Sequence, residues 1–326
     1  LDWHWIFLVN VPVGAAVLVL TLVLIPSGRG HATGRLDVAG AVTVTAASMV
    51  AVYAIVNGND AGWTSARTLG LLGLSAALLV LFVGIESRTR EPLVPLALFR
   101  LRNLTTANVV GILWAAAMFA WFFLSALYLQ LVLGYSPLQV GLAFLPGNLI
   151  MGALSLGVSA KLVMRFGIRA PLAVGLGMAA VGLVLFARAP VDGSFAIDVL
   201  PGMILLGAGA GIAFNPVLLA AMSDVAPEEA GLASGVVNTS FMMGGALGLA
   251  VLASIAASRT DTLLGSGDEA LVALNGGYRA AFLAGALCAA GAAVIGAVFL
   301  RAGQGQQVQH EERDRTRRMS PVADSD

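Results

Sequence analysis

The chain has 326 residues, of which 58% are hydrophobic and only 11% are charged, and its formal net charge is zero. A water-soluble domain carries about 25% charged residues, so this composition excludes an ordinary soluble globular protein. The equal numbers of basic and acidic residues indicate no nucleic-acid partner, and the single cysteine, Cys288, excludes an intramolecular disulfide and a thiolate metal site.

Nine stretches of the chain are apolar over the roughly 20 residues that a helix needs to cross a bilayer. Each is apolar on nearly all sides, which is typical of a membrane span and not of a surface helix. The sequence therefore predicts an all-α polytopic membrane protein with nine transmembrane helices. They are expected at about 4–25, 36–56, 68–86, 105–132, 138–160, 169–188, 196–221, 230–257 and 278–300.

The two ends of the chain differ from the apolar stretches between them. The chain begins with Leu1, and no basic segment or cleavage site marks the first apolar stretch as a signal peptide. We therefore expect the sequence to be a fragment of a longer protein. The segment 302–326 is polar and mixed in charge, which predicts a disordered tail.

Basic residues are divided unequally between the two sets of predicted loops. Four of the 18 fall on one side of the membrane, and the rest fall on the side of the C-terminus. Short loops rich in Lys and Arg remain in the cytoplasm. The distribution predicts a cytoplasmic C-terminus, with the opposite side marked by Arg67, Arg188, Arg259 and Arg279.

The sequence carries no motif of a common enzyme class. It lacks H-E-x-x-H, G-x-S-x-G and a P-loop, and its three histidines are scattered near membrane faces or in the tail. Isolated surface histidines are usually solvated. We therefore expect no enzymatic activity, no metal site and no cofactor.

Three predicted spans combine a proline with a nearby asparagine. A proline inside a helix leaves the carbonyl four residues before it without its usual hydrogen bond. Two interpretations remain open: the amides satisfy the local backbone, or kinks and amides together line a polar cavity. The pairs are Asn10 with Pro12, Asn148 with Pro146, and Asn215 with Pro216.

Glycines crowd the seventh and eighth predicted spans. Gly207, Gly209 and Gly211 lie in the seventh span, and the eighth contains two pairs spaced by four residues, Gly231 with Gly235 and Gly244 with Gly248. Such spacing lets helix backbones approach closely. The glycines indicate tight helix packing or, alternatively, smooth contacts between helices that slide.

The fourth span has two different faces. At 100° per residue, Asn108, Phe119, Phe122 and Gln130 share one side, and Trp114, Trp121 and Tyr128 lie roughly opposite. Two amides and two phenyl rings suit a cavity for an amphipathic organic molecule, although ordinary helix packing would also explain them. We expect the tryptophan side to meet lipid or a neighbouring helix.

Acidic residues avoid the centres of the predicted spans. All 18 lie in loops, in the tail or within a turn of a span end, and the nearest to a span are Asp37 and Asp198. Both have an alternative role as helix N-terminal charges that the helix dipole favours. We therefore expect that a proton-carrying carboxylate, if the protein is proton-driven, is not on this chain.

Several motifs together resemble the major facilitator superfamily and, within it, the fourteen-helix drug:proton antiporter group. The segment from Trp3 to Gly14, the run Leu133-Gly134-Tyr135-Ser136-Pro137 and the pair Asn238-Thr239 carry the resemblance in the family's order. The loop 160–169 is similar to the family's cytoplasmic signature, with candidate residues Arg165, Gly167 and Arg169. Met164 stands where the family has Asp, and Phe241-Met242 stands where it commonly has Arg-Gln.

The resemblance implies an organisation and a function. It makes residues 1–35 the last helix of an N-terminal half, 36–99 a two-helix insert with a cytoplasmic linker, 100–301 a C-terminal six-helix half and 302–326 the tail. It implies a plasma-membrane (inner-membrane) exporter of small amphipathic compounds, proton-coupled, working by alternating access with five further helices of the same protein. The implied partners are a small organic substrate, protons and the lipid bilayer.

Two other functions remain open at this point. One is import, or export of a metabolite, by the same fold. The other is a membrane scaffold or sensor that transports nothing. An ion channel is disfavoured because channels need rings of charge or a carbonyl filter, and no predicted span centre carries a charge.

Overall fold

The structure is a computed structural model, which describes residues 8–24, 37–89, 92, 94, 96–226 and 229–301. Every regular element in these ranges is a helix. The chain divides into two compact units, residues 1–36 and residues 37–326, and each is described by itself. The predictions for Trp3, for the three histidines and for the tail 302–326 fall outside the described residues.

The first unit contains one described helix, α2 (Asn10–Leu24). It has 15 residues, all of them exposed, and it covers most of the first predicted span. Because α2 begins at Asn10, Pro12 lies in its first turn, where the missing N–H breaks no intrahelical hydrogen bond. Pro12 therefore interrupts no hydrogen bond within the described helix.

The second unit contains eight apolar helical segments long enough to cross a membrane. They confirm eight of the nine predicted spans and a multi-pass membrane protein. The segments are α3 (Val38–Val56); α5 (Ala66–Glu86); α6 (Arg102–Leu127) with η2 (Tyr128–Val132); α7 (Pro137–Ala153) with η3 (Leu154–Val158) and α8 (Ser159–Phe166); α9 (Arg169–Arg188); η4 (Phe195–Val199) with α10 (Leu200–Met222); α11 (Ala230–Gly265); and α12 (Ala270–Phe299). Two short helices, α4 (Gly58–Ala61) and η1 (Leu96–Arg100), complete this unit.

Local sequence explains where several of these helices begin. Asp37 caps α3 by accepting a hydrogen bond from the Gly40 N–H at 2.8 Å. Ser136 and Gln139 form a capping box at the start of α7, where Pro137 takes the first helical position. Hydrophobic length makes these segments membrane spans, and the caps fix their first residues.

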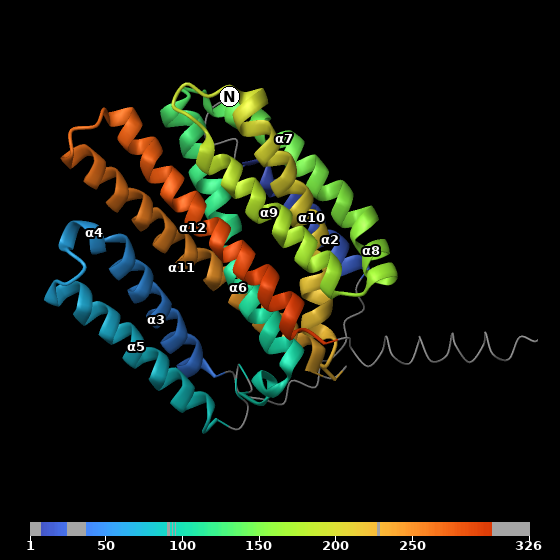
Figure 1. Cartoon of the computed structure of the whole chain (residues 1–326). Helices are drawn as coiled ribbons and strands as arrows, with labels where there is room; N and C mark the ends of the chain where they lie inside the picture. The colour runs from blue at the N-terminus through green and yellow to red at the C-terminus, as the bar shows by residue number, and fades with distance from the viewer. Residues whose placement is uncertain are drawn as a thin grey trace, which may run out of the picture. The chain divides into compact units, whose positions relative to one another are not determined.

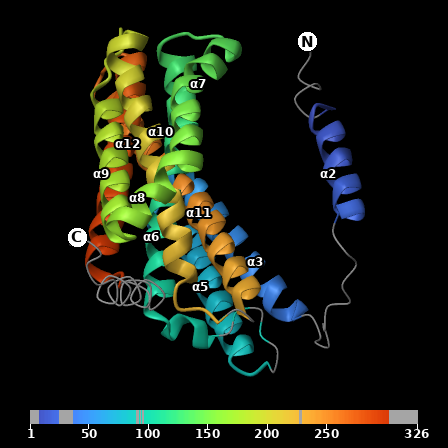
Figure 2. The ribbon, with the colours of Figure 1, turned by 90° about the vertical axis from the view of Figure 1, so that its right-hand side faces the viewer.

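Six of the segments form one bundle. Helix α10 packs between α7 and α9, α12 packs on α9, and α6 packs on α11 and α12 (Figure 1). The hairpin of α3 and α5 lies along α11, and α3 makes the contact (Figures 1 and 2). The six packed segments lie between residues 102 and 299, and the hairpin of α3 and α5 precedes them in the chain. The division into a six-helix half and a two-helix insert stays a prediction.

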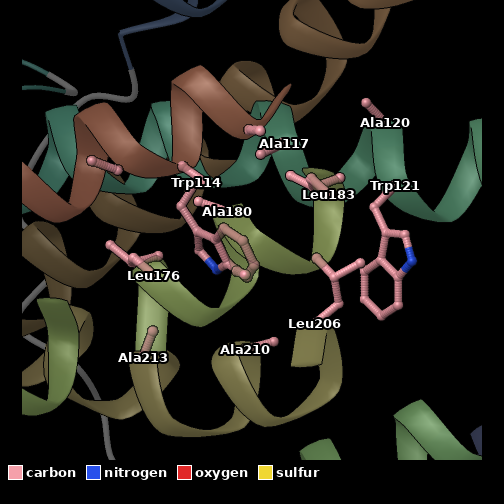
Figure 3. Packing of buried hydrophobic residues seen from close by; sticks show 14 of the residues in the cluster. Trp114, Ala117, Ala120, Trp121, Leu176, Ala180, Leu183, Leu206, Ala210 and Ala213 are labelled. Atoms are coloured by element: carbon pink, nitrogen blue, oxygen red, sulfur yellow. The ribbon is translucent and has the colours of Figure 1, made fainter. Parts of the chain in front are cut away.

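The centre of the bundle is built from two tryptophans of α6. Figure 3 shows Trp114 pointing toward Leu176 of α9, and Trp121 lying near Leu183 and Leu206 of α9 and α10. Trp114 is 1% exposed and Trp121 is fully buried. The tryptophan side of α6 therefore meets neighbouring helices and not lipid.

Helix ends differ from the predicted span ends where the chain becomes polar. The loop predicted around 160–169 is mostly helix α8, and the predicted loop between residues 257 and 278 shrinks to a turn between α11 and α12. Lys, Arg, Leu and Met are good helix formers, so the helix continues after the apolar run ends. Hydropathy here identified the end of the apolar run, and not the end of the helix.

Candidate substrate-binding face

The predicted cavity side of α6 is partly open and partly buried. Asn108 is only 4% exposed, Phe119 and Phe122 are half-buried, and Gln130 is exposed in η2. The two rings lie less than one turn apart, but each belongs to a different aromatic cluster. The predicted face of α6 therefore contacts two different helices, α11 through Phe119 and α7 through Phe122.

The first cluster joins three helices of the bundle. Phe241 of α11 makes edge-to-face contacts with Phe119 of α6 and with Phe214 of α10, with ring centroids 6.3 Å and 6.4 Å apart. Phe214 is 44% exposed, so the cluster reaches the surface of the bundle. We call these three rings, together with the exposed Asn238 one turn before Phe241, the aromatic face.

The second cluster joins α6 to α7. Phe122 stacks on Phe144 at 5.5 Å with an interplanar angle of 19°, and Trp121 lies 4.4 Å from Phe122. Phe122 and Phe144 are both half-buried, whereas Trp121 belongs to the core. This cluster continues the packed core toward the surface between α6 and α7.

The aromatic face depends on small residues of α11. A Cβ on Gly245 would lie 2.8 Å from the ring of Phe119, and a Cβ on Gly244 would lie 2.7 Å from the backbone of Ile112. Glycine at these positions lets α11 approach α6 closely enough for Phe119 and Phe241 to meet. Small residues on α11 thus determine which rings share this face.

The predicted amides have different surroundings. Asn215 donates to the Ser155 carbonyl at 2.8 Å, and Ser159 donates to the Ile212 carbonyl, which Pro216 frees, at 2.9 Å. These bonds join α10, near Pro216, to the π-helical segment η3 and to the first residue of α8. The Asn215 amide thus has a backbone partner, as the first of the two interpretations expects.

Asn108, like Asn215, donates to a backbone carbonyl, but its own side-chain oxygen has no partner among the described residues. Its amide nitrogen donates to the Leu104 carbonyl of the same helix at 2.9 Å. Its oxygen Oδ1 is buried and has no hydrogen-bond partner among the described residues. Asn108 therefore retains an unused acceptor inside α6.

The remaining predicted residues do not join the aromatic face. Asn148 lies exposed on α7, close to Pro146 inside the same helix, and Gln130 lies exposed on η2. Among the described residues, no hydrogen bond or ring contact connects either amide to Phe119, Phe214 or Phe241. The seven predicted cavity residues are thus not gathered in one place. Phe119 and Asn238 belong to the aromatic face, Phe122 contacts Phe144, Asn215 contacts η3, Asn108 is buried in α6, and Asn148 and Gln130 lie apart.

The residues predicted to form a cytoplasmic signature lie at one tight reversal. Gly167 has φ of 73° and follows α8, and its N–H bonds to the Val163 carbonyl at 2.9 Å. The guanidinium of Arg165 lies 5.2 Å from the centre of the Phe166 ring, and Arg169 begins α9. The positive charges flank the reversal without an ion pair to any described carboxylate.

Polar side chains at both ends of the bundle form hydrogen bonds between helices, a role that the sequence predicted for none of them. At one end Asn103, 1% exposed, donates to Ser223 Oγ at 2.9 Å and accepts from the Arg301 N–H at 2.8 Å. These bonds link the start of α6 to the ends of α10 and α12. Asn103 precedes the predicted start of the fourth span near residue 105, and it lies in the first turn of the observed α6.

At the other end three side chains hold the turn after α9. Tyr128 donates to the Pro190 carbonyl at 2.7 Å, Asn275 to the Ala189 carbonyl at 3.1 Å, and Arg279 to the Ala187 carbonyl at 2.8 Å. The donors come from η2 and α12. These bonds connect helices α6, α9 and α12 at one end of the bundle.

Comparison with known proteins identifies the family. The family model of the Major Facilitator Superfamily matches residues 1–249. The chain belongs to the major facilitator superfamily. The resemblance to this superfamily that the sequence motifs indicated is thus confirmed over residues 1–249.

Several relatives are named for resistance or export. The chain is 34% identical over 259 residues to the multidrug resistance protein Stp of Mycobacterium tuberculosis, which covers 79% of this chain and 48% of the relative. It is 36% identical over 264 residues to the tetracenomycin C resistance and export protein of Streptomyces glaucescens, covering 79% and 48%. A transporter of this superfamily from Mycobacterium tuberculosis, EfpA, is 35% identical over 330 residues, covering 95% and 59%. The chain therefore spans about half the length of the curated relatives it matches.

Proposed function

We propose that this member of the superfamily exports small amphipathic organic compounds from the cell. The observation that carries the proposal is the aromatic face, which offers phenyl rings beside an exposed amide. No charged residue occurs in α10, Arg102 is the only one in α6, and the first in α11 is Arg259. Such a surface suits a molecule with an apolar ring system and a few polar groups. The names of the relatives support the same substrate class.

Transport by this bundle requires a second wall for the cavity. We propose that the helices of residues 100–301 rock as one body against further helices of the same protein, with the C-terminus in the cytoplasm. The hydrogen bonds at both ends of the bundle support rigid-body movement. The unequal distribution of basic residues supports the orientation.

The function is tested by measuring drug efflux. The protein used is the one encoded by the longest reading frame that contains this chain. In cells without other efflux pumps, we expect that protein to permit growth on puromycin, lincomycin or tetracenomycin C at concentrations that stop vector-only cells. A protonophore should abolish the effect, because the proposed export is proton-driven. Equal growth and equal drug accumulation with and without the protein would contradict the proposal.

The proton-carrying acid is proposed to lie outside this chain. Asp37 caps α3, Asp198 accepts from the Ser194 N–H at 2.7 Å, and Glu86, which is 3% exposed, accepts from the Val94 N–H at 3.3 Å. Each of these three carboxylates thus accepts a backbone hydrogen bond in its own region.

We expect Asp37→Asn and Asp198→Asn to leave proton-driven efflux within about twofold of the unchanged protein, because the Asn side-chain oxygen can accept the same backbone hydrogen bond. The measurement is substrate-induced proton release from the purified protein. Asp268→Asn, in the turn between α11 and α12, is the matched control. Loss of proton release with substrate binding intact in either variant would place the coupling acid on this chain.

A further inference from the structure

A cavity of about 390 Å³ lies between the α3–α5 hairpin and α11, and it belongs to none of the features described above. Trp63 forms one wall, and a stripe of α11 that includes Ser258 and Arg259 forms the other, beside Ala280 of α12. Trp63 follows α4, in the connection between the two spans of the hairpin. A tryptophan at that level of a membrane protein marks the boundary between headgroups and acyl chains.

The tryptophan wall is held in place from both sides. Trp63 Nε1 donates to Asn59 Oδ1 at 2.8 Å, and Asn59 Nδ2 donates to the Ser254 carbonyl of α11 at 3.0 Å. The indole packs on the buried Gly58, where a Cβ would lie 3.1 Å from the ring. One amide therefore fixes the indole and also fastens the hairpin to α11.

The α11 wall changes from apolar to polar along the helix. Val251 and Ile255 line the cavity toward the middle of the span, and Ser258, Arg259 and Thr262 line it toward the end. Among the residues that the structure describes, no carboxylate lines the cavity and no acid forms an ion pair with Arg259. The cavity thus has an unpaired cation with hydroxyl groups at one end and branched aliphatic side chains at the other.

We propose that this cavity binds an anionic glycerophospholipid. The phosphodiester lies against Arg259 and the hydroxyl of Ser258, the glycerol region lies beside Trp63, and the acyl chains follow Val251 and Ile255. An Arg that carries no acidic partner is complementary to a phosphate. The lipid fills the joint between the hairpin and α11, where α3 supplies most of the protein contact. This site is independent of which compounds the protein exports.

Native mass spectrometry of the purified chain 1–326, titrated with dioleoylphosphatidylglycerol, tests the site. Dioleoylphosphatidylcholine is the neutral reference lipid. We expect tighter binding of phosphatidylglycerol, and we expect Arg259→Gln to weaken it about fivefold, the contribution of one basic residue near a membrane surface. Arg259→Lys should restore most of the preference. Arg188→Gln removes an exposed arginine at the end of α9, distant from the cavity lining, and should change nothing.

A second variant and a competition with phosphate distinguish specific lipid binding from the alternatives. Ser258→Asp, an exposed substitution that places a carboxylate beside Arg259, should also remove the preference, and it replaces Arg259→Gln if that variant does not fold. Inorganic phosphate at millimolar concentration should not compete with phosphatidylglycerol. Equal affinity for both lipids, equal effects of Arg259→Gln and Arg188→Gln, or displacement by phosphate would each overturn the proposal.

Discussion

Gly209→Leu is expected to abolish folding of the bundle, whereas Gly177→Leu is expected to be tolerated. A Cβ on Gly209 would lie 2.8 Å from the Ala179 N of α9 and closer still to the Gly175 carbonyl. In return, a Cβ on Gly175 would lie 2.7 Å from the Gly209 carbonyl. Both obstacles are backbone atoms, which cannot move without separating α9 from α10. Overpacking by a few methylene groups in a rigid core costs about 1–3 kcal/mol, and a leucine against backbone exceeds that range.

Gly177 provides the matched control because it lies on α9, two residues after Gly175, and a Cβ there has nothing within 4 Å. The measurement is the fraction of detergent-extracted chain that elutes as a monodisperse peak, together with its melting temperature. Gly209→Ala should give a smaller loss than Gly209→Leu. Similar elution and melting of Gly209→Leu and Gly177→Leu would contradict the observed crossing of α9 and α10.

The glycines show what a sequence pattern predicts and what it leaves open. The spacing of Gly244 and Gly248 predicted close packing, and both contact α6, at Ile112 and Ala116. The identical spacing of Gly231 and Gly235 predicted the same contact, but a Cβ at either position meets nothing within 4 Å. Spacing gives the face of the helix that the glycines share. It does not reveal whether another helix covers that face.

The eight described spans were predictable because the cost of exposing apolar length to water is a property of each segment alone. Their ends were less predictable. Helix α11 continues through Arg259 to Gly265, since those polar residues still form helix outside the apolar region. Prediction of the spans therefore succeeded where a long apolar run determines the helix. It failed where residues with good helix propensity extend the helix beyond that run.

The candidate face was predicted only in part for a related reason. Phe119 and Phe122 were found by their spacing on α6, but their partners Phe241 and Phe144 come from other helices. No local pattern marks those two residues, and Phe241 drew notice only as a departure from the family's Arg. Contacts between residues far apart in sequence depend on helix packing, which the glycines of α11 set.

The aromatic face gives the second large expected effect, which is measured as efflux by the full reading frame. Phe241→Leu keeps a bulky apolar side chain but removes the ring that contacts both Phe119 and Phe214. An aromatic pair contributes about 0.5–1.5 kcal/mol, so loss of one ring contact to a bound aromatic compound should reduce transport about three- to tenfold. Puromycin, which contains aromatic rings, should be affected strongly, and lincomycin, which has none, should be affected little.

Phe186→Leu is the control for this experiment. Phe186 is 1% exposed and pairs with Phe282 at 5.2 Å inside the bundle, away from the aromatic face. Because it supports packing and cannot reach a substrate, its substitution should lower the amount of folded protein and reduce efflux of both compounds equally. Efflux is therefore compared at equal amounts of protein in the membrane.

If Phe241→Leu also lowers puromycin and lincomycin efflux in parallel, Phe241 acts only in packing, and the substrate lies elsewhere. A selective loss of puromycin efflux would place its ring system against α6, α10 and α11, because Phe241 is the ring that contacts its neighbours on both other helices.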